Sequence, residues 1–166
     1  MSRDKKFQLR SSPPRGRDGK RLYAVGDVHG CLTELTELMA MIASDHASRP
    51  ARDCHIVFLG DLVDRGPRSR EVIAYLRHEA PRFARLHFVR GNHEEMMVRC
   101  LLGEASLIPG WLQHGGLACA LSYGVDPADL MGDPDPERMK QILRACIPRE
   151  DIEFLYQSVD MIRFGD

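Results

Sequence analysis

LYAVGDVHG at residues 22–30, HIVFLGDLVDRG at 55–66 and LHFVRGNHE at 86–94 share one arrangement, in which a short apolar run leads into a polar, glycine-bracketed block. Asp27 and Asp61 are 34 residues apart, and Asp61 and Asn92 are 31 apart, so the blocks recur at about the length of one strand–helix–strand unit. In α/β proteins, ligands bind beyond the carboxyl ends of parallel strands. The repetition therefore predicts a polar site where three parallel strands end.

The segments between the blocks and after the last block carry apolar residues at helical spacing. This spacing predicts a helix from Leu32 to about Pro50, a second one capped by Ser69 and ending before Pro81, and a third one after the last block. Further helices are predicted over 104–113, 116–123, 135–146 and 149–158, and residues 160–166 alternate like a strand. The pattern predicts an α/β fold, with a parallel βαβαβ unit followed by a helical segment.

Composition and charge fit one globular domain with a distinct amino-terminal segment. The chain has 166 residues, of which 43% are hydrophobic and 28% are charged. Residues 1–21 carry eight Lys and Arg against two Asp, which predicts a basic flexible arm at 1–21 and a domain at 22–166. The arm is either a solvated tail or a docking segment. The formal net charge of −1 points to no particular partner, and we expect no specific nucleic acid.

The cysteines and the hydropathy pattern indicate the cell compartment. Five cysteines are widely spaced and form no C-x-x-C pair, which favours free thiols in a reducing environment. No apolar run approaches the length of a transmembrane helix, so we expect no membrane association. We therefore expect a cytoplasmic protein.

The side chains of the blocks suit metal-assisted phosphoester hydrolysis. Asp27 and His29 lie one residue apart in a turn, so both could hold one ion, and the two oxygens of Asp61 could bridge two ions. Asn92 offers a neutral oxygen to an ion or to the substrate. Two divalent ions can clamp a phosphate and lower the pKa of a bound water.

Three further residues suit phosphate binding and proton transfer. Arg65 offers a planar fork to phosphate oxygens. His93 could protonate the leaving oxygen, and Asp64 could orient its imidazole ring. Each residue also has a structural interpretation, as a helix cap, a turn residue or half of a surface ion pair. Three such blocks after three strands make that interpretation improbable when they are taken together. The other histidines are interpreted as structural: His46, His55, His78, His87 and His114.

The three blocks resemble the signature of the calcineurin-like metallophosphoesterases, and more narrowly that of the Ser/Thr protein phosphatase branch with its bacterial and phage-lambda-type enzymes. Residues 111–124 are similar to a segment of the bacterial members, and the resemblance covers residues 20–166. It implies the amino-terminal part of a metallophosphoesterase sandwich. It also implies two divalent metal ions with Asp27, His29, Asp61 and Asn92 as ligands. Mn is the first candidate for the metal, and Fe and Zn are the alternatives.

The resemblance also implies roles for the remaining residues and a substrate. His93 would be the general acid, Asp64 its orienting partner and Arg65 a phosphate ligand. The substrate would be a phosphoserine, phosphothreonine or phosphotyrosine protein. Hydrolysis of symmetrical dinucleoside tetraphosphates is the alternative within the family. Those enzymes usually lack an Asp at the position of Asp64 and have Asp in place of Glu94, so these two residues favour the phosphoprotein branch.

The sequence departs from the family pattern at its carboxyl-terminal end. Family members supply three more metal-binding histidines and a second phosphate-binding Arg from a second half, and none of these is found here. We therefore expect an amino-terminal portion, truncated at its carboxyl-terminal half, that alone is weakly active or inactive. An inactive fragment or pseudophosphatase that binds a partner is the alternative of another class. An open sheet edge would also allow self-association.

Overall fold

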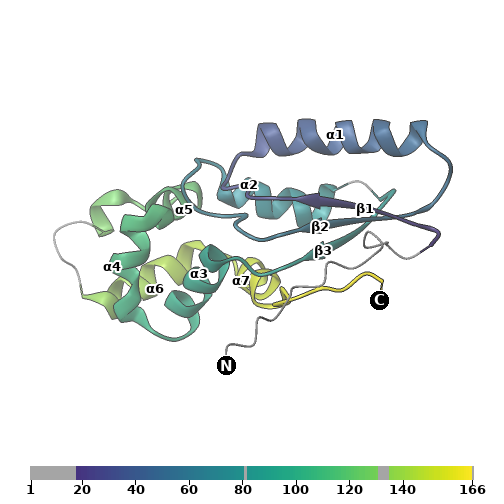
Figure 1. Ribbon diagram of the computed structural model, residues 1–166. Coiled ribbons are helices and arrows are strands. Elements are labelled where there is room, and N and C mark those ends of the chain that lie inside the picture. Colours follow the sequence, from purple (N-terminus) through teal and green to yellow (C-terminus); the bar gives the residue numbers. More distant parts are fainter. Residues whose placement is uncertain (1–17, 81, 131–134, 166) are drawn as a thin grey trace, which may run out of the picture.

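The computed structural model describes residues 18–80, 82–130 and 135–165 (Figure 1). Three strands and several helices alternate along the first hundred residues, and short helices follow. The strands and helices of this first part are β1 Lys20–Val25, α1 Leu32–Ser48, β2 Asp53–Phe58, α2 Ser69–Ala74, the π-helical turn Tyr75–Glu79, β3 Arg85–Phe88 and α3 Asn92–Leu102. The later elements are a 3₁₀ turn Ala105–Leu107, α4 Ile108–Trp111, a π-helical turn Leu112–Gly116, α5 Leu117–Ser122, a 3₁₀ turn Pro127–Leu130, α6 Pro136–Cys146 and α7 Arg149–Tyr156.

The sheet is parallel, with the strands in the order β1-β2-β3. Val25 lies opposite Phe58, and Phe58 lies opposite Phe88, so the three strands end nearly level. All residues of β2 after Asp53 are buried, as expected for a central parallel strand covered on both faces. This arrangement confirms the predicted α/β class with a parallel βαβαβ unit.

Helices cover the sheet through apolar side chains at helical spacing. Helix α1 lies over one side of the sheet (Figure 1) and buries Leu35, Met39 and Ile42, which recur on one face of the helix. On α7, Phe154 packs edge-to-face on Phe88 of β3, with ring centroids 4.8 Å apart. Helices α3, α4, α5 and α6 gather beyond the carboxyl ends of the strands, whereas α2 lies alongside the sheet (Figure 1).

Three local expectations differ from the structure. Residue 68, not Ser69, is the N-cap of α2; Ser69 is buried and its hydroxyl accepts the backbone N–H of Asp64 at 3.1 Å. The helix expected over 104–113 is divided into a 3₁₀ turn, α4 and part of a π-helical turn, and Pro109 lies at the start of α4. Only Val159 pairs with the sheet, in a single bridge to Val89, so residues 160–165 form no strand.

The ends of the predicted domain are only partly described. Lys20 and Arg21, which were assigned to the basic arm, are the first residues of β1. Residues 1–17 of that arm lie outside the described residues. The outer strands of the sheet are β1 and β3, and self-association through an open edge stays a prediction.

Candidate active site

The three polar blocks meet where the strands end, and their backbone is strained there. Four non-glycine residues of the described chain have a positive φ: His29 at 44°, Asp61 at 53°, Asp64 at 70° and Arg65 at 64°. All four belong to the first two blocks. Residues other than glycine adopt this region at a cost, and such strain gathers at functional sites. The sequence alone carried no signal of this strain.

Backbone hydrogen bonds join the first block to the second. The amides of Val28 and His29 both donate to Asp61 O at 2.9 Å, and the amide of Gly30 donates to Leu62 O at 2.9 Å. The loops approach so closely that a Cβ at Gly66 would collide with His29 O. Gly30, Gly60, Gly66 and Gly91 are therefore required by the close approach of the loops, whereas a Cβ at Gly26 would meet no atom within 4 Å.

A buried carboxylate joins the second block to the third. Glu94 is fully buried and accepts the amides of Asp61 at 2.8 Å, Leu62 at 2.7 Å, Val63 at 3.3 Å and Gly91 at 2.9 Å. Burial raises the pKa of Glu94, and the backbone N–H groups oppose that rise. Sequence reasoning used Glu94 only to choose between branches of the family and missed this role. The carboxylate holds the turn that carries Asp61.

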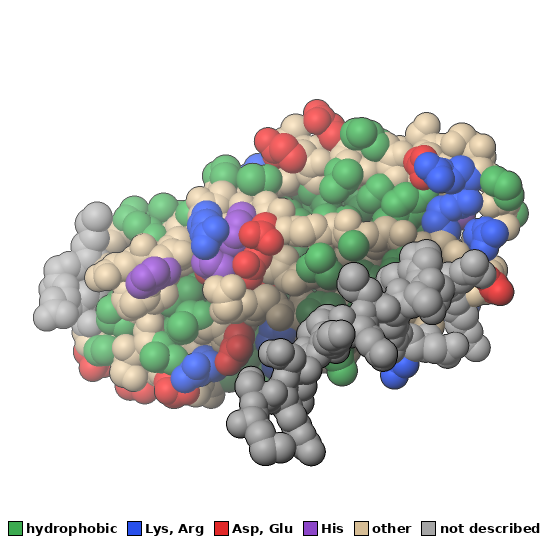
Figure 2. Space-filling model, in the orientation of Figure 1, with side chains coloured by type: hydrophobic (Ala, Val, Ile, Leu, Met, Phe, Trp, Pro, Cys, Tyr) green, Lys and Arg blue, Asp and Glu red, His purple; other side chains and the backbone are tan. Residues whose placement is uncertain are grey.

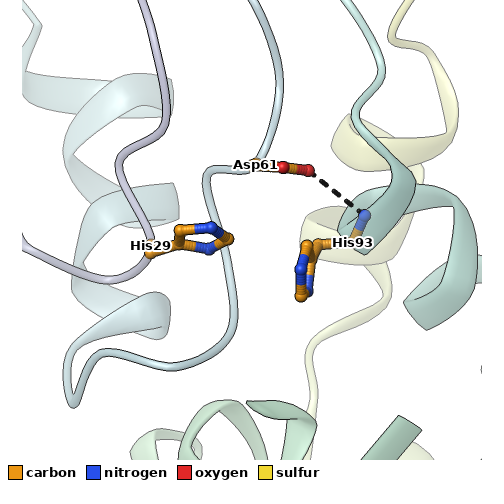
Figure 3. A group of neighbouring side chains, drawn as sticks. All are labelled: His29, Asp61 and His93. Atoms are coloured by element: carbon orange, nitrogen blue, oxygen red, sulfur yellow. Dashed lines mark hydrogen bonds between the residues drawn. The ribbon is translucent and has the colours of Figure 1, made fainter. Parts of the chain in front are cut away.

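His29, Asp61 and His93 form a group that fits a metal ion (Figure 3). One ligand atom from each lies within 4.8 Å of the others. His29 Nδ1 lies 2.8 Å from Val63 O and donates its proton there, so Nε2 carries the lone pair. That Nε2 is buried and has no hydrogen-bond partner in the described chain. Asp27 Oδ2 lies 3.7 Å from it, and the Asp27 side chain is 68% exposed.

The chemistry of these donors suits a divalent metal ion, and the full set of predicted ligands stays a prediction. Imidazole and carboxylate groups suit Mn, Fe and Zn, and a ring nitrogen fixed by a hydrogen bond from the other nitrogen is typical of metal-ligating histidines. Asp27, His29 and Asp61 lie where the sequence predicts them. Asn92 is exposed in the first turn of α3. The compact group also contains His93, which the sequence analysis assigned to proton transfer.

The predicted pair of His93 and Asp64 is formed, and Trp111 completes it. His93 Nδ1 lies 2.8 Å from Asp64 Oδ2, and Trp111 Nε1 donates to the same oxygen at 2.9 Å. The carboxyl group of Asp64 is fully buried, which raises its pKa, and the bonds from His93 and Trp111 oppose the rise. Nothing in the spacing of the blocks indicated that Trp111, 47 residues away from Asp64, is a partner.

The other nitrogen of His93 faces Arg65. Arg65 Nη2 lies 3.0 Å from His93 Nε2, and the backbone amide of Arg65 donates to Gly115 O at 3.0 Å. The side chains of Arg65, Asn92 and His93 together line a cavity of about 470 Å³. His114, interpreted from the sequence as structural, lines the same cavity. Histidine, basic and acidic side chains gather on this face (Figure 2). The arrangement can hold a cation on one side and an anion beside it.

The family model described as calcineurin-like phosphoesterase matches residues 20–155. The chain belongs to the calcineurin-like phosphoesterase family. The symmetrical bis(5'-nucleosyl)-tetraphosphatase of Methylococcus capsulatus is 44% identical over 73 residues, which are 44% of this chain and 23% of that protein. Serine/threonine-protein phosphatase 1 of Salmonella typhimurium is 35% identical over 97 residues, which are 58% of this chain and 39% of that protein.

The chain is also similar to a solved structure. A provisionally named diadenosine tetraphosphatase has a TM-score of 0.48 and 22% identity, over 87% of this chain and 45% of that chain. The matched part of the chain covers less than half the length of each of these three proteins. No helix of the described residues is both long and apolar enough to cross a membrane.

Proposed function

We propose that this site hydrolyses phosphoesters with two divalent metal ions, for which Mn²⁺ is the first candidate and Fe or Zn are the alternatives. The observation that carries the proposal is the buried Nε2 of His29, which has no hydrogen-bond partner among the described residues and lies beside Asp27 and Asp61. Such a nitrogen is costly to bury unless a ligand completes it. Bound divalent ions would neutralise phosphate charge and lower the pKa of a water molecule beside them.

The ligands divide between two ions. We assign Asp27, His29 and Asp61 to the first ion, and Asp61 and Asn92 to the second. Glu94 supports this assignment because its bonds hold the backbone turn that carries Asp61, a residue that would help to hold both ions. Asn92 also lines the cavity, so its amide is available to a phosphate oxygen.

The remaining residues bind the phosphate and move a proton. Arg65 would bind two phosphate oxygens, because its guanidinium lies beside His93 at the wall of the cavity. As the bond between phosphorus and the leaving oxygen breaks, His93, protonated on both ring nitrogens, would give that oxygen the proton of Nε2, and Arg65 would bind the phosphate in place of Nε2. Asp64 would keep the imidazole in place through Nδ1, and Trp111 would keep Asp64 in place.

The first substrate candidate is a symmetrical dinucleoside tetraphosphate. The names of the relatives favour this alternative over the protein phosphatase that the motif details predict, because symmetrical tetraphosphatases from several bacteria match at 35–44% identity. Water added across the central anhydride bond would yield two nucleoside diphosphates. The pairing of His93 with Asp64 is compatible with this leaving group, since a proton from His93 would neutralise the negative charge on the released phosphate oxygen.

A phosphoprotein is the second candidate. Two observations favour it: the Salmonella protein phosphatase matches a larger share of this chain than the Methylococcus relative does, and Asp64 and Glu94 are the residues expected in that branch. The structure gives both residues a use, one beside His93 and one beneath the Asp61 turn.

Hydrolysis assays with Mn²⁺ test the proposal and separate the substrates. Diadenosine tetraphosphate, a phosphoserine peptide and 4-nitrophenyl phosphate are compared, with chromatography of the nucleotide products. We expect weak turnover by the chain alone, with ADP as the single nucleotide product of the first substrate, and loss of that turnover in Asp61→Asn. A higher kcat/KM with the phosphopeptide would favour the second candidate. Turnover that survives both Asp61→Asn and a chelator would refute the metal site.

Calorimetry of Mn²⁺ binding tests the site without turnover. We expect the wild-type chain to bind Mn²⁺ and Asp61→Asn to bind it more weakly. Equal affinities in the two proteins would contradict the ligand assignment, whatever substrate is hydrolysed.

A further inference from the structure

The cavity beside His93 is larger and more apolar than a phosphate requires. Its volume is about 470 Å³, within the range of about 300–1,000 Å³ that is typical of small-molecule sites. Met96 of α3, Leu107 and Trp111 supply apolar walls, and Ser106 and His114 supply polar groups. A phosphate group is small and strongly hydrated, so the apolar part of this cavity is suited to another part of a ligand.

The cavity opens on the side of the proton donor. Its lining includes Arg65, Asn92 and His93 but neither of the metal-side residues Asp27 and His29. Met96 follows His93 by three positions on α3, so the two side chains are neighbours on the helix surface. A group attached to an oxygen that is protonated by His93 would therefore meet Met96 next.

The walls suit a flat ring. Trp111 is held in place by its bond to Asp64 and by Gly116, where a Cβ would collide with the indole ring. A fixed indole and a thioether make favourable contacts with aromatic rings. The described lining contains no acidic side chain, so a ring that carries a phosphate would meet no charge repulsion there.

We infer that this cavity binds an aromatic ring carried by the leaving group, and that Met96 and the space at Gly110 set the preference for it. The inference rests on the proposed function only in calling the His93 side the leaving-group side. The ring has two chemical sources: an aryl group bonded through one oxygen, as in a phenyl or tyrosyl phosphate, or the base of a nucleotide.

Binding of phosphonates, which are not hydrolysed, tests the inference. Trp111 is the single tryptophan of the chain and lines the cavity, so its emission reports on a ring bound there. Phenylphosphonate is titrated in buffer with Mn²⁺, and methylphosphonate and ADP are measured as competitors. We expect phenylphosphonate to bind about 10- to 100-fold more tightly than methylphosphonate, from the burial of one ring. ADP distinguishes the source of the ring.

Two variants and a matched control locate the preference. Gly110→Leu fills the cavity; a Cβ at Gly110 meets no atom within 4 Å, so the variant should fold. Met96→Gln makes a wall polar. Met41→Gln is the control, because Met41 is 69% exposed on α1, away from the cavity. We expect Gly110→Leu and Met96→Gln to reduce the ring preference about 10-fold or more and Met41→Gln to leave it unchanged.

The outcomes separate this inference from the proposed function. Phenylphosphonate and methylphosphonate binding with equal affinity, or a preference retained in both cavity variants, would overturn the inference, even if phosphoesters are hydrolysed. A ring preference that the cavity variants remove supports it, even if Asp61→Asn fails to affect hydrolysis. Tighter binding of ADP than of phenylphosphonate would support the nucleotide as the source of the ring, and the reverse order would support an aryl phosphate.

Discussion

Two histidine pairs lie at different places on the sheet and differ in their surroundings. At the carboxyl ends of the strands, the rings of His29 and His93 lie edge-to-face with centroids 4.8 Å apart. Within β2 and β3, His55 and His87 are stacked at 5.1 Å, and His55 Nδ1 lies 2.8 Å from His87 Nε2. Both pairs have a nearby aspartate. Their composition alone does not show which pair belongs to an active site.

The two pairs differ in whether the ring nitrogens of their histidines have hydrogen-bond partners. Both nitrogens of His55 have partners, since Nδ1 faces His87 Nε2 and Nε2 lies 3.0 Å from an Asp53 oxygen. His29 Nε2, in contrast, is buried and has no partner in the part of the chain that the structure describes, and His29 has a positive φ. Burial lowers the pKa of His87, which favours a neutral, structural histidine. Strain and an unpartnered nitrogen therefore distinguish the site from the structural pair, and four predictions test this distinction.

The largest expected difference concerns the two histidines themselves. His93→Asn should lower kcat by about 10²- to 10⁴-fold, because it removes the proton donor. His87→Asn should leave kcat within about 2-fold. The measurement is hydrolysis of the substrate chosen by the assays above, with Mn²⁺ present. Similar losses in both variants would mean that the stacked pair is not merely structural.

Glu94 tests whether the strained turn depends on its buried carboxylate. Glu94→Gln replaces one acceptor oxygen by an NH₂ group that faces backbone N–H donors, so we expect a loss of about 1–3 kcal/mol in the free energy of unfolding. Relief of carboxylate burial offsets part of this loss. Urea denaturation measures it, with the exposed neighbour Glu95→Gln as the control. Equal stability of Glu94→Gln and wild type would show that the turn is held by other bonds.

The aspartates near each pair should differ in metal binding. Asp61→Asn should weaken Mn²⁺ binding by about 10-fold or more, since losing a ligand costs at least as much as losing a residue that supports one. Asp53→Asn should leave the affinity unchanged, because Asp53 is already bonded to His55. Titration calorimetry decides between them. A loss of affinity in Asp53→Asn would place an ion at the structural pair.

The smallest effect is expected far from the site, where Tyr23 donates to Asp45 at 2.6 Å and joins β1 to α1. This bond, with those from Arg49, lowers the pKa of Asp45 below its ordinary value of 3.8. Such stabilisation is complete above 3.8 and is lost as the pH falls through the lowered value. Tyr23→Phe should therefore lower the urea midpoint slightly at pH 7 and not at strongly acidic pH. The exposed Tyr156→Phe is the control, and a pH-independent difference would contradict the assignment.

Much of the sheet and part of the site could be predicted from the sequence, because both depend on short-range patterns. The apolar runs before Gly26, Gly60 and Gly91 predict parallel strands, and the ends of the three observed strands lie within two residues of the ends of these runs. The pair of His93 and Asp64 could also be predicted. The role of Ser69 and the backbone conformation of residues 160–165 could not be predicted, because helix capping and strand pairing depend on which neighbours are present. The buried bond from the Asp64 amide to Ser69 is an example.

The sequence by itself determined that the chain is an α/β protein with three polar blocks at strand ends, because side-chain periodicity and glycine spacing are local properties. Only the tertiary structure decided the rest. It placed Glu94 beneath the Asp61 turn and Trp111 on Asp64, left His29 Nε2 without a partner, and opened an apolar cavity beside His93. These features depend on contacts between residues far apart in the chain. Such contacts form only when the loops pack together, so local spacing does not reveal them.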